Sequence, residues 1–207
     1  MTGTGKSRLI RALAARGAQV IDLEALAAHR GSVLGGLPEA PQPSQKAFET
    51  RLWQALARLD PHRPVYVESE SRKIGDVRVP EPLILAMWAS PCIVIQAETP
   101  LRVALLMDEY AHFLTDRITL ADRLSALTTL HGHARIARWM ALADENRHAE
   151  LVAELLELHY DPAYRRSIGS HYAALASAPT LAVSARDGAA AFDRLAAQLT
   201  DEEPVAA

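Results

Sequence analysis

The chain opens on a phosphate-binding pattern, and this feature limits its possible folds more than any other. Gly5-Lys6-Ser7 matches the end of the pattern Gly, four residues, Gly-Lys-Ser/Thr, although the leading glycine is absent. In such a loop the backbone N–H groups surround a phosphate at a helix N-terminus, and the lysine reaches the outer phosphates. We therefore expect Gly3, Thr4, Gly5, Lys6 and Ser7 to bind phosphate. The alternative is a flexible terminus that only begins a helix.

The elements that follow favour the loop. Residues 6–16 have an apolar helical face and end at Gly17, and residues 18–22 read as an apolar strand. The remaining pattern predicts strands at 64–68, 92–97 and 180–184, and helices at about 45–59, 80–89, 100–166 (interrupted near Thr115, 131–133 and 161–162) and 187–199.

Alternating strands and helices predict the α/β class. We expect a P-loop NTPase-like open, mostly parallel sheet with flanking helices, whose first strand is lacking. The predicted P-loop domain covers 1–200, with a helical insert at about 100–166 and a tail at 201–207.

Cysteine content and charge narrow the class of protein. Cys92 is the single cysteine, which excludes an intrachain disulfide and a cysteine-based zinc site and suits a cytoplasmic location.

No apolar run is long enough to cross a bilayer, so we expect no membrane partner. Residues 1–80 hold 12 Lys and Arg against 8 Asp and Glu, although the net charge of the whole chain is -3. A basic front half beside a phosphate loop favours a polyanionic partner.

Acidic residues follow two of the predicted strands. Because ligands in open α/β sheets lie beyond the carboxyl ends of the strands, Asp22, Glu68 and Glu70 are expected near the phosphate loop. Glu68 is placed like a Walker-B acid, which with Ser7 would hold Mg²⁺ or orient water. The alternative for both Glu68 and Asp22 is a strand-end acid that caps the next turn.

Several other polar residues are candidates. His29 and Arg30 lie on a long Gly- and Pro-rich loop and are candidates for phosphate contact, although taken alone they are more simply explained as an ordinary polar loop. Arg72 and Lys73, after the acids, are candidates for contact with phosphate or an RNA backbone; the alternative is a solvated face. The remaining candidates are more simply explained by structure: a turn for His131-Gly132-His133, a core position in a strand for Cys92, and solvated side chains for Arg165 and Arg166.

Together these stretches resemble a known family, the C-terminal P-loop domain of bacterial tRNA 2-selenouridine synthases. The resemblance is carried by DLEALAAHRGS at 22–32, QPSQ at 42–45 with Phe48-Glu49, VESESRKIG at 67–75 and YDPAY at 160–164.

The resemblance implies a transferase that replaces sulfur by selenium in the wobble 2-thiouridine of tRNA. It implies selenophosphate as the selenium donor, and geranyl diphosphate for a geranyl group that is attached to the sulfur. The family's essential cysteine lies in an N-terminal rhodanese-like domain, which is absent from this sequence and would be a partner; Cys92 does not match it. We therefore expect the chain alone to be incomplete for selenium transfer.

Two other functions fit the same motifs. A nucleotide-dependent small-molecule kinase would also use a phosphate loop, a strand-end acid and a helical cover. A non-catalytic tRNA-binding module would bind tRNA in a salt-dependent way without turnover. The motifs leave open whether ATP is bound.

Overall fold

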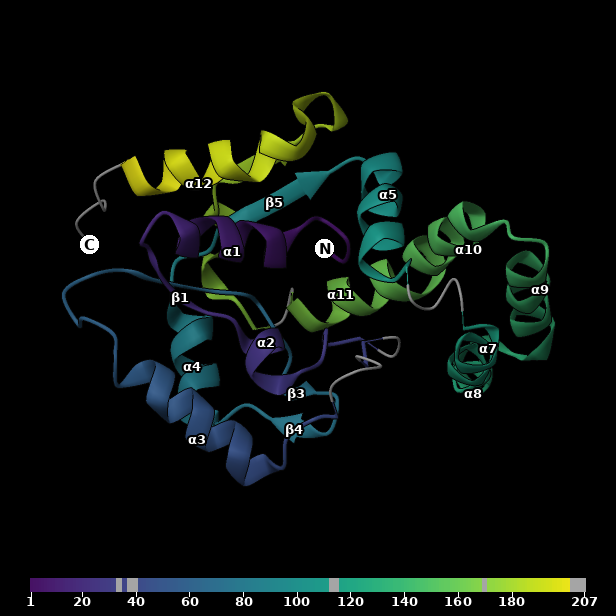
Figure 1. Cartoon of the computed structure of the whole chain (residues 1–207), viewed down its shortest axis with the longest axis horizontal. Coiled ribbons are helices and arrows are strands. Elements are labelled where there is room, and N and C mark those ends of the chain that lie inside the picture. The colour runs from purple at the N-terminus through teal and green to yellow at the C-terminus, as the bar shows by residue number, and fades with distance from the viewer. Residues whose placement is uncertain (33–34, 37–40, 112–115, 169–170, 202–207) are drawn as a thin grey trace. The chain divides into compact units, whose positions relative to one another are not determined.

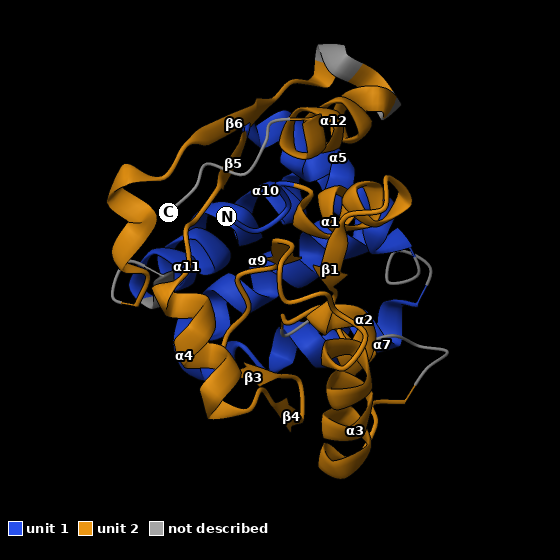
Figure 2. Cartoon of the chain, turned by 90° about the vertical axis from the view of Figure 1, so that its left-hand side faces the viewer, with its two compact units in different colours: residues 1–4, 97–166 blue, residues 5–96, 167–207 orange. Residues whose placement is uncertain are grey.

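A computed structural model describes residues 1–32, 35–36, 41–111, 116–168 and 171–201 of the chain. The described residues form two compact units, which Figure 2 distinguishes by colour. Unit 1 comprises residues 1–4 and 97–166, and unit 2 comprises residues 5–96 and 167–207. The expected tail at 201–207 lies outside the described residues except for Asp201, which ends the last helix.

Unit 2 contains the strands and most of the residues singled out above. Its helices, labelled in Figure 1, are α1 (Lys6–Ala15), α2 (Leu23–Ala27), α3 (Gln45–Leu56), α4 (Glu81–Ala89) and α12 (Ala191–Asp201), with short 3₁₀ segments η2 (Ala173–Ser177) and η3 (Ala185–Ala190). Its strands are β1 (Gln19–Ile21), β2 (Val65–Val67), β3 (Lys73–Ile74), β4 (Val77–Arg78), β5 (Val94–Ala97, whose last residue belongs to unit 1) and β6 (Thr180–Val183).

The predicted mixed α/β class is confirmed. β1 and β2 are parallel, with Ile21 opposite Val67, and α2 and α3 lie between them in the chain. Such a crossover is what parallel neighbours require. Among the described residues the strands form three separate pairs, β1–β2, β3–β4 and β5–β6. The antiparallel β3–β4 hairpin is not predicted by the sequence pattern, because its two-residue strands lie inside a charged stretch.

Local signals explain where the helices of unit 2 begin and end. Ser44 caps α3, with its hydroxyl accepting a hydrogen bond from the Ala47 amide at 3.3 Å. Gly17 follows α1 at a φ of 80°, which ends the helix. Phe48 and Leu52 of α3 are buried, whereas Leu56 is exposed.

Two groups of apolar side chains form the core of unit 2. The larger group packs α2, α3 and α4 against the hairpin: Ile21, Leu23, Ala27, Phe48, Leu52, Ile74, Val77, Val79, Ile84 and Met87. The second lies where α12 packs on α1, as Figure 1 shows. Arg16, which directly follows α1, also donates hydrogen bonds to Thr200 at 3.0 Å and Asp201 at 3.3 Å. α12 is therefore attached along the helix that follows the phosphate loop.

Unit 1 is helical in its described residues. Its elements are α5 (Thr99–Glu109), α7 (Arg117–Ser125), α8 (Thr128–His131), α9 (His133–Asp144), α10 (His148–Leu155), the π-helical turn η1 (Leu156–Tyr160) and α11 (Asp161–Ile168), whose last two residues belong to unit 2. The predicted interruption near Thr115 lies outside the described residues, and the one at Gly132 separates α8 from α9. The interruption predicted at 161–162 is wrong, because Pro162 lies in the first turn of α11, where its missing N–H is tolerated.

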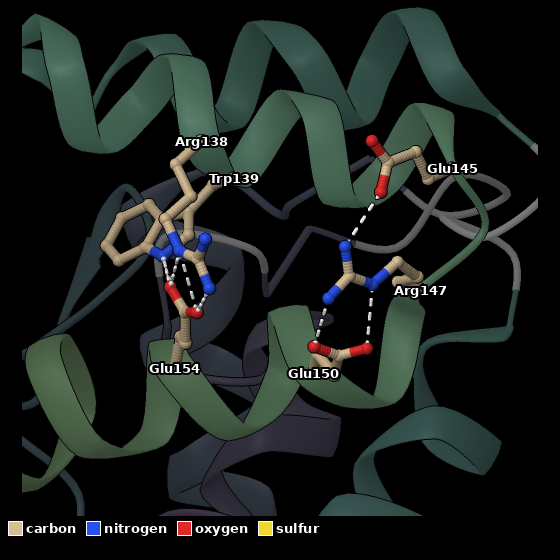
Figure 3. Close-up of polar contacts among 6 residues, drawn as sticks. All are labelled: Arg138, Trp139, Glu145, Arg147, Glu150 and Glu154. Carbon is tan, nitrogen blue, oxygen red and sulfur yellow. Dashed lines mark hydrogen bonds and ion pairs between the residues drawn. The ribbon is translucent and has the colours of Figure 1, made fainter.

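Charged side chains join α9 to α10. Figure 3 shows Arg138 and Trp139 of α9 both directed at Glu154 of α10. The indole N–H of the fully buried Trp139 donates to Glu154 at 3.1 Å. At the turn between the helices, Arg147 donates to both Glu145 and Glu150. Glu154 therefore satisfies a buried donor as well as pairing with an exposed cation.

None of the helices in the described part of the chain is both long enough and apolar enough to cross a membrane.

Candidate functional site

The backbone of the predicted phosphate loop has a conformation that favours glycine at two positions. Gly3 and Gly5 have φ values of 73° and 85°, a region that side chains with a Cβ rarely adopt. Gly5 is the N-cap of α1, so Lys6 and Ser7 lie in the first helical turn. The Thr4 hydroxyl donates to the Met1 carbonyl at 3.0 Å. The segment therefore begins a helix from a tight glycine turn, as a phosphate loop does.

The Ser7 side chain contacts a carboxylate that sequence reasoning missed. Its hydroxyl donates to Glu24 Oε2 at 2.8 Å. Glu24 lies in the first turn of α2, which starts directly after β1. The signals in the sequence are its position two residues beyond the strand-end Asp22 and its place in the DLEALAAHRGS run at 22–32. Glu24 is thus the acid that this structure places against the loop serine.

Glu68 lies beside Glu24. It follows β2, whose neighbour β1 leads into Glu24, and the Glu24 amide donates to Glu68 Oε1 at 2.8 Å. The Glu68 side chain is buried, and no described residue makes a hydrogen bond to its Oε2. A buried carboxyl oxygen without a partner is costly, so Glu68 is poorly explained as a turn cap.

Asp22 has a structural contact. Its carboxylate accepts a hydrogen bond from the Ala25 amide at 2.8 Å and caps α2. Of the two interpretations left open by the sequence, the structure shows this one. Its charge still acts on the neighbouring carboxyls described next.

The site concentrates negative charge. Burial raises the pKa of Glu68 well above its usual value, and the charges of Glu24, Asp22 and Glu70 raise it further. Burial likewise raises the pKa of Glu70 to about 7, against the opposing effect of Lys6. An anion that entered this site would be repelled unless protons or a cation compensated the carboxylates.

The donor chemistry is compatible with a hard cation. Ser7, Glu24 and Glu68 offer oxygen atoms only, and one of these, Glu68 Oε2, has no hydrogen-bond partner among the described residues. No group of three or more His, Cys, Asp or Glu side chains in the described ranges is arranged to hold a metal ion by itself. Mg²⁺ commonly uses one or two carboxylates and completes its coordination with phosphate and water, so these residues fit it together with a phosphate ligand.

We expect the raised pKa of Glu70 to make stability depend on pH. Between about pH 4.5 and about pH 7 the folded chain keeps a proton that the unfolded chain releases, so stability falls as pH rises through this window. Glu70→Gln should remove this loss, worth about 1–2 kcal/mol because the side chain is partly exposed. Urea unfolding at about pH 5 and about pH 8 in metal-free buffer measures it.

The control for this prediction is Glu49→Gln, which changes an exposed carboxyl on α3. Its unfolding free energy should follow the wild-type pH profile. A Glu70→Gln profile that also runs parallel to the wild type would contradict the prediction.

The loop that carries His29 and Arg30 packs against the site. The Gly31 amide donates to His29 Nδ1 at 3.1 Å, and the Arg30 amide donates to the Gly35 carbonyl at 2.8 Å. A Cβ on Gly31, which has a φ of 66°, would overlap the Glu70 carboxylate. His29 is largely buried, so its described role is to hold the loop. Arg72 and Lys73, at the start of the hairpin, are exposed.

The other candidates have structural explanations. Cys92 lies before β5, so its predicted place within a strand is wrong; its thiol donates to the Ser90 carbonyl at 3.6 Å, and burial raises its pKa. A thiol with a raised pKa is a poor nucleophile. In unit 1, His131 Nε2 lies 3.1 Å from His159 Nδ1, and Gly132 forms the turn that was predicted. Arg165 and Arg166 are exposed on α11.

Comparison with known proteins identifies relatives. The family model described as "tRNA 2-selenouridine synthase AAA domain" matches residues 1–133. A tRNA 2-selenouridine synthase from Marinobacter nauticus is 41% identical over 111 residues, covering 53% of this chain and 29% of the relative. One from Aeromonas salmonicida is 32% identical over 198 residues, covering 82% of this chain and 52% of the relative. The chain thus spans about a third to a half of such relatives. No solved structure matches it.

Proposed function

The chain belongs to the tRNA 2-selenouridine synthase AAA domain family, and on that premise we propose that it is the phosphate-binding part of a tRNA-modifying transferase. The observation that carries the proposal is the contact between the loop serine and a pair of glutamates, of which Glu68 is buried. Ser7 donates to Glu24, and the Glu24 amide donates to Glu68. We propose that these oxygen atoms act as ligands next to Ser7, which follows the loop lysine Lys6 in the chain.

We propose that the bound phosphate compound is geranyl diphosphate, with selenophosphate as the donor of the later step. The Lys6 ammonium and the amides of Gly5 and Lys6, next to Gly3 and Thr4 in the loop, would bind the diphosphate. Ser7, Glu24 and Glu68 would hold Mg²⁺, which supplies positive charge opposite the phosphates when bound. Arg30, Arg72 and Lys73 would contact the tRNA.

The proposed reaction moves a geranyl group to the sulfur of wobble 2-thiouridine. A bond forms between the sulfur and C1 of the geranyl group, the bond from C1 to the diphosphate oxygen breaks, and the N3 proton of the base passes to solvent. The chain's contribution is to position the diphosphate and to neutralise the charge that develops as it leaves. The geranylated sulfur would then leave more readily than the sulfur of unmodified 2-thiouridine when selenium replaces it.

We propose that replacement by selenium also needs a rhodanese-like domain with a reactive cysteine, because Cys92 has the environment of an unreactive thiol. We place the reaction in the cytoplasm, which suits a tRNA-modifying family whose thiol chemistry requires reducing conditions.

The test is to incubate the chain with 2-thiouridine tRNA, geranyl diphosphate and Mg²⁺, and to measure geranylated nucleoside by mass spectrometry. We expect Lys6→Ala to lower product formation by about 100-fold or more, because the lysine meets charge that develops in the transition state. Lys46→Ala is the matched control. Lys46 is an exposed lysine on α3 and is remote from the loop in the sequence. The control should keep wild-type activity.

Three other outcomes would contradict the proposal, and two of them would favour a different function. Product formation that is equal in Lys6→Ala and Lys46→Ala would remove the phosphate loop from the reaction. Binding of tRNA without product would leave a tRNA-binding module. ATP turnover without a tRNA product would favour a nucleotide-dependent kinase.

A further inference from the structure

Three side chains far apart in the sequence stack on one another in unit 2. The Arg72 guanidinium carbon lies 4.7 Å from the centroid of the Trp88 ring. The rings of Trp88 and His171 are 4.3 Å apart between centroids, at an interplanar angle of 31°. Arg72 precedes β3, Trp88 lies near the end of α4 and His171 precedes η2, so three separate segments contribute.

This stack lies at the surface. The Arg72 side chain is 53% exposed, His171 is exposed and Trp88 is half-buried. Arg72 also donates to Glu81 at 3.3 Å, seven residues before Trp88 on α4. Leu85, between these two positions on the same helix, is 51% exposed. Since residues at this spacing share one side of a helix, Arg72 extends along an exposed, partly apolar side of α4.

The hairpin beside the stack carries two cations that oppose each other. Lys73 of β3 is the direct cross-strand partner of Arg78 of β4, and both are exposed. Like charges in this position destabilise a hairpin. Neither side chain forms an ion pair with a described residue, although Asp76 lies on the same hairpin. Two exposed cations at directly opposite positions favour a partner that carries negative charge.

A purely structural role explains only part of this arrangement. Stacking on Trp88 would attach the segment of His171 to α4, which contacts η2. It does not explain why a guanidinium and an imidazole, both polar and exposed, are the groups placed on the indole. It also gives no reason for placing two like charges, Lys73 and Arg78, opposite each other.

We propose that this surface binds an unpaired stretch of RNA, with one base stacked against the Arg72, Trp88 and His171 group and the adjoining phosphates contacted by Lys73 and Arg78. Guanidinium and aromatic planes are the groups on which proteins stack unpaired bases, and lysine and arginine contact the RNA backbone. The inference rests on the proposed function, in which tRNA is the substrate, and it specifies how unpaired nucleotides of that tRNA are held.

The test measures binding of the full chain to a fluorescently labelled single-stranded oligouridine by anisotropy. We expect Trp88→Leu to weaken binding about tenfold, because stacking against an aromatic ring contributes that order of affinity per base. Trp53→Leu is the matched control, since Trp53 is 69% exposed on α3, and it should bind like the wild type. Trp88→Phe keeps a ring and should recover most of the affinity.

The salt dependence of binding and the comparison of single-stranded with duplex RNA test the inference independently. Lys73→Ala and Arg78→Ala should each reduce the slope of log affinity against log salt by about one, as expected for one lost phosphate contact. Arg72→Gln changes an exposed side chain, so it tests the stack even if Trp88→Leu fails to fold, and it should also weaken binding. An RNA duplex of the same length should bind more weakly than the single strand.

Results that would overturn the inference are equal affinities of Trp88→Leu and Trp53→Leu, an Arg72→Gln variant that binds like the wild type, or binding of duplex and inorganic polyphosphate as tight as that of the single strand. Lys6→Ala should leave oligouridine binding unchanged. Loss of geranylation in Lys6→Ala together with no effect of Trp88→Leu and Arg72→Gln on RNA binding would therefore refute this inference alone and leave the proposed function standing.

Discussion

Replacing Gly5 by alanine should lower the free energy of unfolding by about 3 kcal/mol and remove diphosphate binding. Two effects add. Gly5 has a φ of 85°, where a residue with a Cβ is strained by about 1 kcal/mol. In addition, the new Cβ would overlap the ring of Phe192, with the Cε1 atom only 2.5 Å away. Phe192 is buried on α12, so its ring can yield only by disturbing the packing of α12 on α1.

Urea unfolding measures the stability change, and calorimetric titration with geranyl diphosphate and Mg²⁺ measures binding. Gly17→Ala is the matched control. Gly17 has a similar φ of 80° at the other end of α1, but nothing lies within 4 Å of the position that an added methyl carbon would take. It should lose about 1 kcal/mol, from backbone strain alone, and keep diphosphate binding. Equal losses in the two variants would show that the ring of Phe192 does not restrict the loop.

Replacing Asp161 by alanine should destabilise the chain by about 3–5 kcal/mol. Arg102 of α5 is 4% exposed and donates to both oxygens of Asp161, at 3.0 and 2.6 Å. Its Nε also donates to the Thr2 carbonyl at 2.9 Å. All three residues belong to unit 1. The alanine variant would leave a buried guanidinium without its counter-charge, which is the costly case for an ion pair.

Two comparisons test this cause by urea unfolding. Asp144→Ala removes the partner of Arg117 in a pair that is 55% and 74% exposed, and should cost less than about 1 kcal/mol. Arg102→Met combined with Asp161→Leu removes both buried charges and should recover most of the stability lost in Asp161→Ala. If the double variant is as unstable as Asp161→Ala, the loss comes from packing and not from an unpaired charge.

The buried ion pair of Asp161 also explains part of the family resemblance. The YDPAY run at 160–164 suggests function by its position in the family pattern, yet its aspartate is held in a buried ion pair and its proline begins α11. Sequence alone could not distinguish these roles, because the partner Arg102 is 59 residues away. The same limit applies to Trp88 and His171, whose contact joins α4 to a segment that the sequence left without an assignment.

Local patterns in the sequence were sufficient for the parts of the structure that depend on local contacts. Glycine at positions 3, 5 and 17, the serine cap of α3 and the apolar strands before Asp22 and Glu68 all follow from backbone geometry or from hydrophobic spacing. The α/β class follows from the order of these elements.

Only the tertiary structure decided which carboxylate meets the loop serine. Asp22, Glu24, Glu68 and Glu70 are equivalent in charge, but Asp22 caps α2, Glu24 accepts from Ser7, and Glu68 is buried with one oxygen that no described residue hydrogen-bonds. The raised pKa values of Glu68 and Glu70 likewise arise mainly from burial. Burial and mutual charge depend on distances between segments that are remote in sequence, and those distances exist only once the parallel strands have brought their ends together.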